Sequence, residues 1–412
     1  MTPVNTISNV ISDSNSLPVS GPRVVALALA CGLAVATLYY NQPLLPAMAA
    51  GVGSGPSAQG AITMLTQIGY ALGLLLFGPL GDRLDRRRLV ACLIPANIAG
   101  LVLSATASSL AWLLAASMLV GVTGVTAQII IPAISSLVAP AKRGHTVGCL
   151  MSGLFAGTLL ARTLSGYVGE HAGWRTMFAL AAVIDVLLFV VVWLCLPANR
   201  PSSDMPYSEL MVSLGLLFVR EPLLREACLA GFLLFGALNV LWGSLALMLQ
   251  RPPYSWGSDL TGLFGFVGLA GMLASTKIGR LADHWGARNV VSIAAILVIL
   301  SFSLIAASGY CLALLVLGAI GLDLGSRANL IANQTRLYGL QPEVRGCLNT
   351  VFMISYYVGG AIGSIGGATV GGQYGWIGLG VVGGTCGTLA LVAGHLVRLS
   401  EPVPVSRDRS HG

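Results

Sequence analysis

The stretch Gly78-Pro79-Leu80-Gly81-Asp82-Arg83-Leu84-Asp85-Arg86-Arg87-Arg88 concentrates charge between two long apolar runs, as expected of a tight loop at a membrane surface. A weaker copy, residues 279–288, carries Asp283 at 201 residues after Asp82 and ends at Arg288. Two pairs of short motifs share almost the same offset, 202 residues: Arg143-Gly144 with Arg345-Gly346, and Gly173-Trp174 with Gly375-Trp376. The chain is therefore an internal duplication with a period of about two hundred residues.

The composition indicates a protein that crosses a membrane many times. Of 412 residues, 55% are hydrophobic and 9% are charged, whereas a soluble domain has about a quarter charged residues. The net charge of +7 comes from bases that gather in alternate loops. Basic loops stay on the cytoplasmic side, so we expect both termini in the cytoplasm and no nucleic-acid partner.

A span needs about 20 apolar residues, and the sequence contains twelve such runs. We expect an all-α membrane protein whose twelve transmembrane helices form two six-helix pseudo-repeats around a central cavity, and a chain that holds both halves of its site functions as a monomer. The predicted spans are 24–46, 58–80, 89–107, 111–138, 146–169, 175–196, 226–249, 259–280, 289–307, 310–337, 346–371 and 375–397.

The predicted division follows from the same pattern. A disordered cytoplasmic tail, 1–22, precedes an N-terminal bundle, 23–196, and a cytoplasmic linker, 197–225, leads to a C-terminal bundle, 226–397, and a short tail, 398–412. Within the linker, apolar residues recur at helical spacing between Glu209 and Arg220, which predicts a helix on the membrane surface or, alternatively, a loose linker.

Four charges lie well inside predicted spans. An ion at the bilayer centre costs at least ~2.5–3.5 kcal/mol, so each is a candidate functional residue. Asp323 and Arg327 are four residues apart and share a helix face, where they can pair; the pair is either structural or part of a cavity for substrate or protons. Arg162 has no acid within its own helix turn, and Asp185 is a candidate partner for it or a carboxyl that burial keeps protonated.

Polar side chains near the outer end of the first span form a second candidate. Asn41 and Gln42 follow Tyr39 and precede a proline that frees backbone groups, so they can bind a polar solute, although tyrosine is also an ordinary interfacial anchor. In span ten, Asn333 adds to the polar face of Asp323.

Small residues at four-residue spacing predict close helix packing in spans five and eleven. The row that contains Gly157 recurs 202 residues later at Gly359, Gly363 and Gly367. Such faces serve either as static packing or as sliding surfaces, and their duplication favours a shared mechanical role.

The sequence lacks the motifs that several classes of protein require. The only lysines, Lys142 and Lys277, do not follow glycine as a nucleotide-binding loop requires, and no HExxH or GxSxG motif occurs. The eight cysteines are scattered through apolar runs without metal-ligand spacing. We therefore expect no enzyme, no metal and no cofactor.

The loop between spans two and three resembles the signature of the major facilitator superfamily, and the resemblance covers essentially the whole chain. That signature has glycine at the position of Asp85. In the family this loop holds the cytoplasmic ends of the helices together. The alternative is that its bases only fix the orientation of the chain in the membrane. The resemblance implies the role of holding helix ends for Gly78, Asp82, Arg83, Arg87 and Arg88, and for Asp283 and Arg288 in the second copy.

The fifth span is similar to a motif of the drug–proton antiporter branch. Gly148, Gly157, Ala161-Arg162 and Ser165-Gly166 keep its spacing, but Ala161-Arg162 replaces Gly-Pro. The resemblance implies alternating access, with spans one, four, seven and ten around the cavity and proton-coupled efflux of a small organic solute. It also implies a bacterial inner membrane, because residues 39–46 are similar to a string in bacterial members of that branch. We expect protonation of Asp323 to loosen its pair with Arg327. The alternatives are a proton-independent uniporter or importer of a polar solute and, from another class, a membrane sensor that transports nothing.

Overall fold

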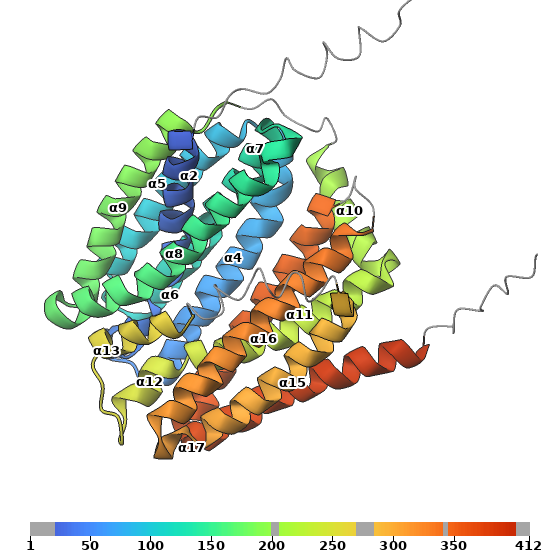
Figure 1. Ribbon diagram of the computed structural model, residues 1–412. Coiled ribbons are helices and arrows are strands. Elements are labelled where there is room, and N and C mark those ends of the chain that lie inside the picture. The colour runs from blue at the N-terminus through green and yellow to red at the C-terminus, as the bar shows by residue number, and fades with distance from the viewer. Residues whose placement is uncertain (1–20, 199–205, 269–283, 341–344, 401–412) are drawn as a thin grey trace, which may run out of the picture.

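The structure is a computed structural model that describes residues 21–198, 206–268, 284–340 and 345–400 (Figure 1). Within these ranges the regular elements are all helices, and the long helices run roughly side by side. Nine of them are long and apolar enough to cross a membrane, and the ninth, Arg345–Leu396, contains the kink that separates two spans. The predicted fold class, an all-α protein with twelve membrane helices in two six-helix pseudo-repeats, is confirmed.

The first six spans are formed by nine helical segments between residues 21 and 195. The first span is divided into three pieces and the fourth into two, while the others are continuous. The elements are α2 Gly21–Ala36, η1 Gln42–Leu44, α3 Leu45–Gly51, α4 Ser57–Arg83, α5 Arg86–Ala105, α6 Leu110–Thr123, α7 Thr126–Leu137, α8 Pro140–Ala172 and α9 Trp174–Cys195.

The second set of spans repeats this pattern. Its eighth span is described only in its first ten residues, so the remainder of the predicted span 259–280 lies outside the described residues, as does Asp283. The elements are α10 Tyr207–Arg220, α11 Pro222–Trp242, α12 Leu245–Gln250, α13 Ser258–Leu263, η2 Phe264–Val267, α15 Ala287–Ala306, η3 Ser308–Tyr310, α16 Leu312–Tyr338 and α17 Arg345–Ser400. The helix predicted within the linker is present as α10, and its place on the membrane surface stays a prediction.

We call the side of the molecule with α10 and the α4–α5 junction the α10 face. Figure 1 shows α10 at the upper right and α12 and α13 at the bottom, on the opposite face. In the first half α2 packs on α8, and in the second half α11 packs on α17. The two halves meet where α4 packs on α17 and where α13 packs on α8.

The charged stretch that resembles the family signature is less of a loop than the sequence predicts. Residues through Arg83 belong to α4, and α5 begins at Arg86, so only Leu84 and Asp85 connect the helices. Asp85 is the N-cap of α5, because its Oδ1 accepts a hydrogen bond from the backbone N–H of Arg87 at 2.9 Å. This cap explains why an aspartate serves where a glycine is usual.

The first and seventh spans break at equivalent positions. The first span turns after Ala36 and resumes at Gln42, immediately before Pro43. The seventh stops at Trp242 and resumes at Leu245, 202 residues after Pro43. Because a break removes intrahelical hydrogen bonds, such segments are tolerated only where protein groups or a cavity satisfy them. The duplication therefore places two irregular segments on the side of the molecule opposite the α10 face.

Candidate functional site

Asp323 and Arg327 form an ion pair inside α16. Arg327 Nε donates to Asp323 Oδ2 at 2.8 Å, and the exposed fractions of the two side chains are 20% for Arg327 and 9% for Asp323. The guanidinium of Arg327 also lies 4.8 Å from the ring centre of Phe155 on α8. The predicted pair is present, and its arginine contacts the other half of the molecule.

Arg162 on α8 lies between the two broken spans. Its Nε donates to Oε1 of Gln42 at 2.7 Å. Its guanidinium lies 3.7 Å from the ring centre of Trp242 and 5.0 Å from that of Tyr39. The side chain is 9% exposed, and it has no ion pair with the described residues. Stacking on aromatic rings stabilises the cation only partly, so Arg162 is a buried charge without a countercharge.

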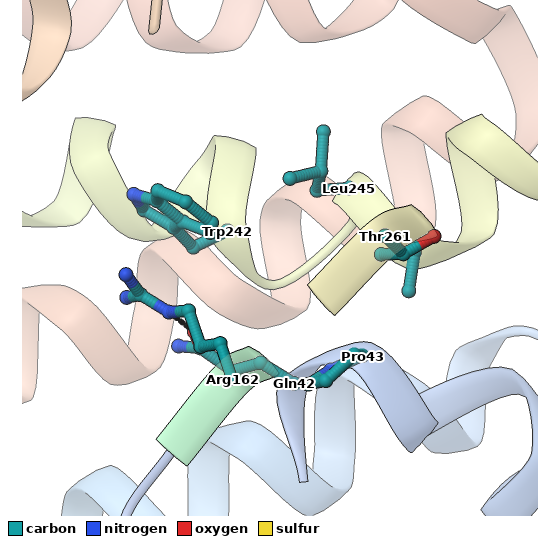
Figure 2. Close-up of a pocket in the computed structure, with 7 residues that line it drawn as sticks. Gln42, Pro43, Arg162, Trp242, Leu245 and Thr261 are labelled. Atoms are coloured by element: carbon teal, nitrogen blue, oxygen red, sulfur yellow. Dashed lines mark hydrogen bonds between the residues drawn. The ribbon is translucent and has the colours of Figure 1, made fainter. Parts of the chain in front are cut away.

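A narrow pocket with a cavity volume of about 10 Å³, room for about one water molecule, adjoins this arginine. Figure 2 shows the hydrogen bond to Gln42 and the guanidinium directed toward Trp242. Thr261 of α13 and Leu245 of α12 complete the opposite wall. Because Gln42 and Arg162 come from the first half and the others from the second, any molecule bound here touches both halves.

The predicted partner of Arg162 is elsewhere. Asp185 on α9 is 2% exposed, its Oδ1 has no hydrogen-bond partner in the described part of the chain, and no ion pair with Arg162 is present there. Tyr40 lies within its electrostatic reach. Asp185 is thus an isolated buried carboxyl inside the first half.

Asn41 and Gln42 are neighbours in sequence but serve different places. Asn41 Nδ2 donates to Thr66 Oγ1 at 3.3 Å. It lines a second small pocket within the first half together with Thr37 and Ser117, away from the interface at which Gln42 lies. The structure therefore joins Tyr39, Gln42 and Arg162 and leaves Asn41 apart.

Asn333 belongs to a buried cluster nearer the α10 face. It donates to Asn329 Oδ1 at 2.7 Å and accepts from Arg336 at 3.2 Å. Arg336 and Arg288 both bind Glu226 Oε2, at 2.6 and 3.0 Å. This cluster links α11, α15 and α16 within the second half, and it places Arg288 in a structural network.

The halves are also joined by an amide pair. Gln67 of α4 donates from Nε2 to Oδ1 of Asn239 on α11 at 3.1 Å, and both residues are buried. Close by, the rings of Tyr70 and Tyr357 lie 4.3 Å apart. Asn239 is not among the candidates that the sequence indicated.

The residues of the signature stretch lie at the α10 face. Gly78 faces Thr350 of α17 across the interface between the halves. Arg87 instead contacts its own half, since it donates to the carbonyl of Trp193 at 2.5 Å and lies 4.4 Å from that ring centre. Arg83 and Arg88 are exposed, and the side chain of Asp82 is outside the described part of the structure.

The duplicated glycine rows pack inside each half. Gly157 faces the backbone of Gly32 on α2, and its counterparts Gly359, Gly363 and Gly367 face α11 at Phe232, Gly236 and Val240. No space remains there for a Cβ atom, because the nearest atoms of the facing helix belong to its backbone. A different glycine contact, Gly166 of α8 against Gly262 of α13, joins the two halves.

Besides Asn239, the sequence did not point to Trp242 at the interface or to the structural residues Glu226 and Arg336. Trp242 looked like an ordinary apolar residue, and Glu226 and Arg336 lie near predicted span ends, where charge is unremarkable. The sequence signal for the Glu226 cluster was a single acid near the end of one span together with bases near the ends of two other spans. The described residues also contain no group of three or more His, Cys, Asp or Glu that could hold a metal ion.

This arrangement is that of a membrane transporter: twelve helices in two repeats, with buried charge at the interface between them. A model of the Major Facilitator Superfamily matches residues 27–364. The uncharacterized transporter YgaY of Escherichia coli O157:H7 is 36% identical over 342 residues, which cover 83% of this chain and 87% of that protein. The probable transporter SCO4007 of Streptomyces coelicolor is 34% identical over 82% of this chain and 79% of that protein.

Solved structures show the same fold. The crystal structure of a peptide transporter POT in complex with sulfate superposes with a TM-score of 0.78 over 93% of this chain and 96% of that chain, at 16% identity. At that identity the likeness concerns the fold alone. The chain belongs to the Major Facilitator Superfamily, and it is a multi-pass membrane transporter.

Proposed function

We propose that this transporter moves a small organic solute by alternating access and that the Asp323–Arg327 pair couples the movement to protons. The observation that carries the proposal is the pair itself, a buried 2.8 Å contact in α16 whose arginine also faces Phe155 of the other half. Protonation of Asp323 removes the charge that holds Arg327. The freed guanidinium then changes its contacts at the interface, which is where the two halves must move.

In this proposal the two bundles, 23–196 and 226–397, rotate about a site between them while the α10 face lies in the cytoplasm of the cell and the protein acts as a monomer. The bases of the α4–α5 junction support that orientation. Contacts across the interface alternate: Gly78 with Thr350 closes the α10 side, and Arg162 with Trp242 closes the opposite side.

The direction of transport has two candidates. Efflux in exchange for protons is favoured by the antiporter-like spacing of glycines in α8. Uptake or uniport is favoured by one specific observation, the buried Arg162 in place of the proline of that motif, because a charge at the interface points to direct solute binding rather than to a purely mechanical helix.

The test uses purified protein in liposomes that contain a pH-sensitive dye, with an imposed pH gradient and a panel of anionic, neutral and cationic organic compounds. The wild type is expected to move protons in a compound-dependent way. Asp323→Asn should abolish that proton movement, because the amide cannot be ionised, whereas Asp259→Asn at the start of α13 should behave like the wild type.

Full proton movement by Asp323→Asn would contradict the assignment of coupling. Solute movement at equal rates with and without the gradient would replace coupled transport by uniport. Binding of a compound without any flux would favour the sensor.

A further inference from the structure

The charge at the interface between the halves is unbalanced. Arg327 is neutralised by Asp323, but no carboxylate lies within 4 Å of Arg162 in the described chain, and Asp185 is elsewhere. Burying a charge without a partner costs several kcal/mol. An anion from outside the described residues would offset that cost.

The hydrogen bonds of Arg162 also leave part of its guanidinium available to a ligand. Its Nε is bound to Gln42, but neither Nη1 nor Nη2 makes a hydrogen bond to the described residues. Other arginines in this protein use those nitrogens for structure: Arg175 donates to the carbonyl of Ala107 at 2.8 Å, and Arg251 donates to that of Gly372 at 2.8 Å. Arg162 thus retains the paired outer N–H groups that bind a carboxylate in two parallel bonds.

The surroundings are those of a solute site. The pocket beside Arg162 lies between the two equivalent breaks of the first and seventh spans, and its wall includes Gln42, Trp242 and Thr261. Transporters of repeated architecture place their substrates at such discontinuous helices between repeats. Trp242 and Gln42 hold the guanidinium in one orientation, so the cost of ordering it is already met before a ligand binds.

We infer that Arg162 binds the carboxylate of a small organic anion and that this anion is the transported solute. The inference rests on the proposed transport function and adds the chemical class of its substrate. Gln42 orients Arg162, Trp242 covers one face of the guanidinium, and Thr261 supplies a hydroxyl near the pocket.

The test measures binding, not transport, with three planar compounds of nearly equal shape: benzoate, benzamide and benzamidine, which are anionic, neutral and cationic. Calorimetric titration of purified wild type in lipid nanodiscs is expected to show benzoate binding about tenfold or more tightly than the other two. Benzoate should also raise the unfolding temperature.

Variants assign that preference to one residue. Arg162→Gln should remove the preference for benzoate. Arg162→Lys should retain part of it, because lysine keeps the positive charge but lacks the two parallel N–H groups that bind a carboxylate. The matched control is Arg175→Gln, which removes another arginine that stacks on a tryptophan, Trp174, at 4.2 Å, and should bind benzoate like the wild type.

Equal binding of the three compounds by the wild type, or an unchanged preference in Arg162→Gln, would overturn the inference. If Arg162→Gln does not fold, the wild-type panel and Arg162→Lys decide. The two proposals can fail separately. Benzoate binding without proton-coupled flux would support anion binding at Arg162 and contradict the coupling role of Asp323. Proton-coupled flux of neutral or cationic compounds only would support the coupling and contradict the anion as the transported solute.

Discussion

Three buried arginines have different partners, and the partner decides what each residue can do. Arg336 is held by Glu226 within one half and serves stability. Arg327 is held by Asp323, which a proton can neutralise, so this pair can switch. Arg162 is held only by an amide and two aromatic rings, which leaves its charge available to a ligand.

At the residue scale the sharpest prediction concerns Glu226. Glu226→Gln leaves Arg288 and Arg336 without their shared carboxylate in a site where Glu226 is 8% exposed. Breaking a buried pair in this way costs about 3–5 kcal/mol, so we expect a clear fall in the thermal unfolding temperature of the purified protein. Glu209→Gln on the exposed side of α10 is the control and should unfold like the wild type. An unchanged unfolding temperature in Glu226→Gln would show that the cluster is dispensable.

The Asp323–Arg327 pair was predictable because its spacing of four residues is local. The partner of Arg162 was not, since Gln42 lies 120 residues away in sequence and spacing carries no information about contacts between spans. Charge balance suggested Asp185, but helix packing directs that carboxyl into the first half.

At the scale of the element, glycine positions decide how closely helices pack. Gly363 of α17 lies against the backbone of Gly236 on α11, whereas Gly384, farther along α17, has no atom near the position of an added Cβ. The same substitution should therefore act in opposite directions at the two sites.

Gly363→Ala is expected to destabilise the protein, because the Cβ collides with backbone that cannot move aside. Gly384→Ala is expected to be neutral or to stabilise it by up to about 1 kcal/mol, the difference in helix propensity between glycine and alanine. Thermal unfolding of both variants measures the contrast. A fall of similar size in both would mean that close packing at Gly363 is not the cause.

Element boundaries were predicted to within a few residues because apolar length determines a span. The breaks in the first and seventh spans were not predicted. Pro43 suggested the first break, but Gly243 and Ser244 look compatible with a continuous helix. The predicted span 58–80 agrees with the apolar part of α4, Ser57–Gly81, and the helix continues into a charged last turn that ends at Arg83.

At the scale of the whole molecule, the charges at the interface link the proton to the proposed anion. Arg162, Arg327 and Asp323 together carry a net charge of +1, and protonation of Asp323 raises it to +2. A proton and an anion should therefore favour each other's binding, which favours movement of both in one direction over exchange.

This linkage is testable with benzoate. Asp323→Asn mimics the protonated carboxyl, and Asp323 lies within electrostatic reach of Arg162. Two unit charges about 10 Å apart interact by ~1.7 kcal/mol at an effective dielectric constant of about 20. We expect the variant to bind benzoate about tenfold more tightly than the wild type, and acidification to bring the wild type toward the variant. Benzamide, which is neutral, is the control. Weaker benzoate binding by the variant would instead indicate competition, as exchange requires.

The backbone contact between α8 and α13 has a mechanical consequence. Gly166 touches Ser258 and Gly262 without any side chain between them, and it lies near one end of α8. Gly166 follows Arg162 by about one helical turn on α8, so this contact belongs to the side that Arg162 and Trp242 close in the proposed cycle. The contact must then separate whenever that side opens. Two backbone surfaces without side chains between them can separate and meet again without any side chain having to change rotamer.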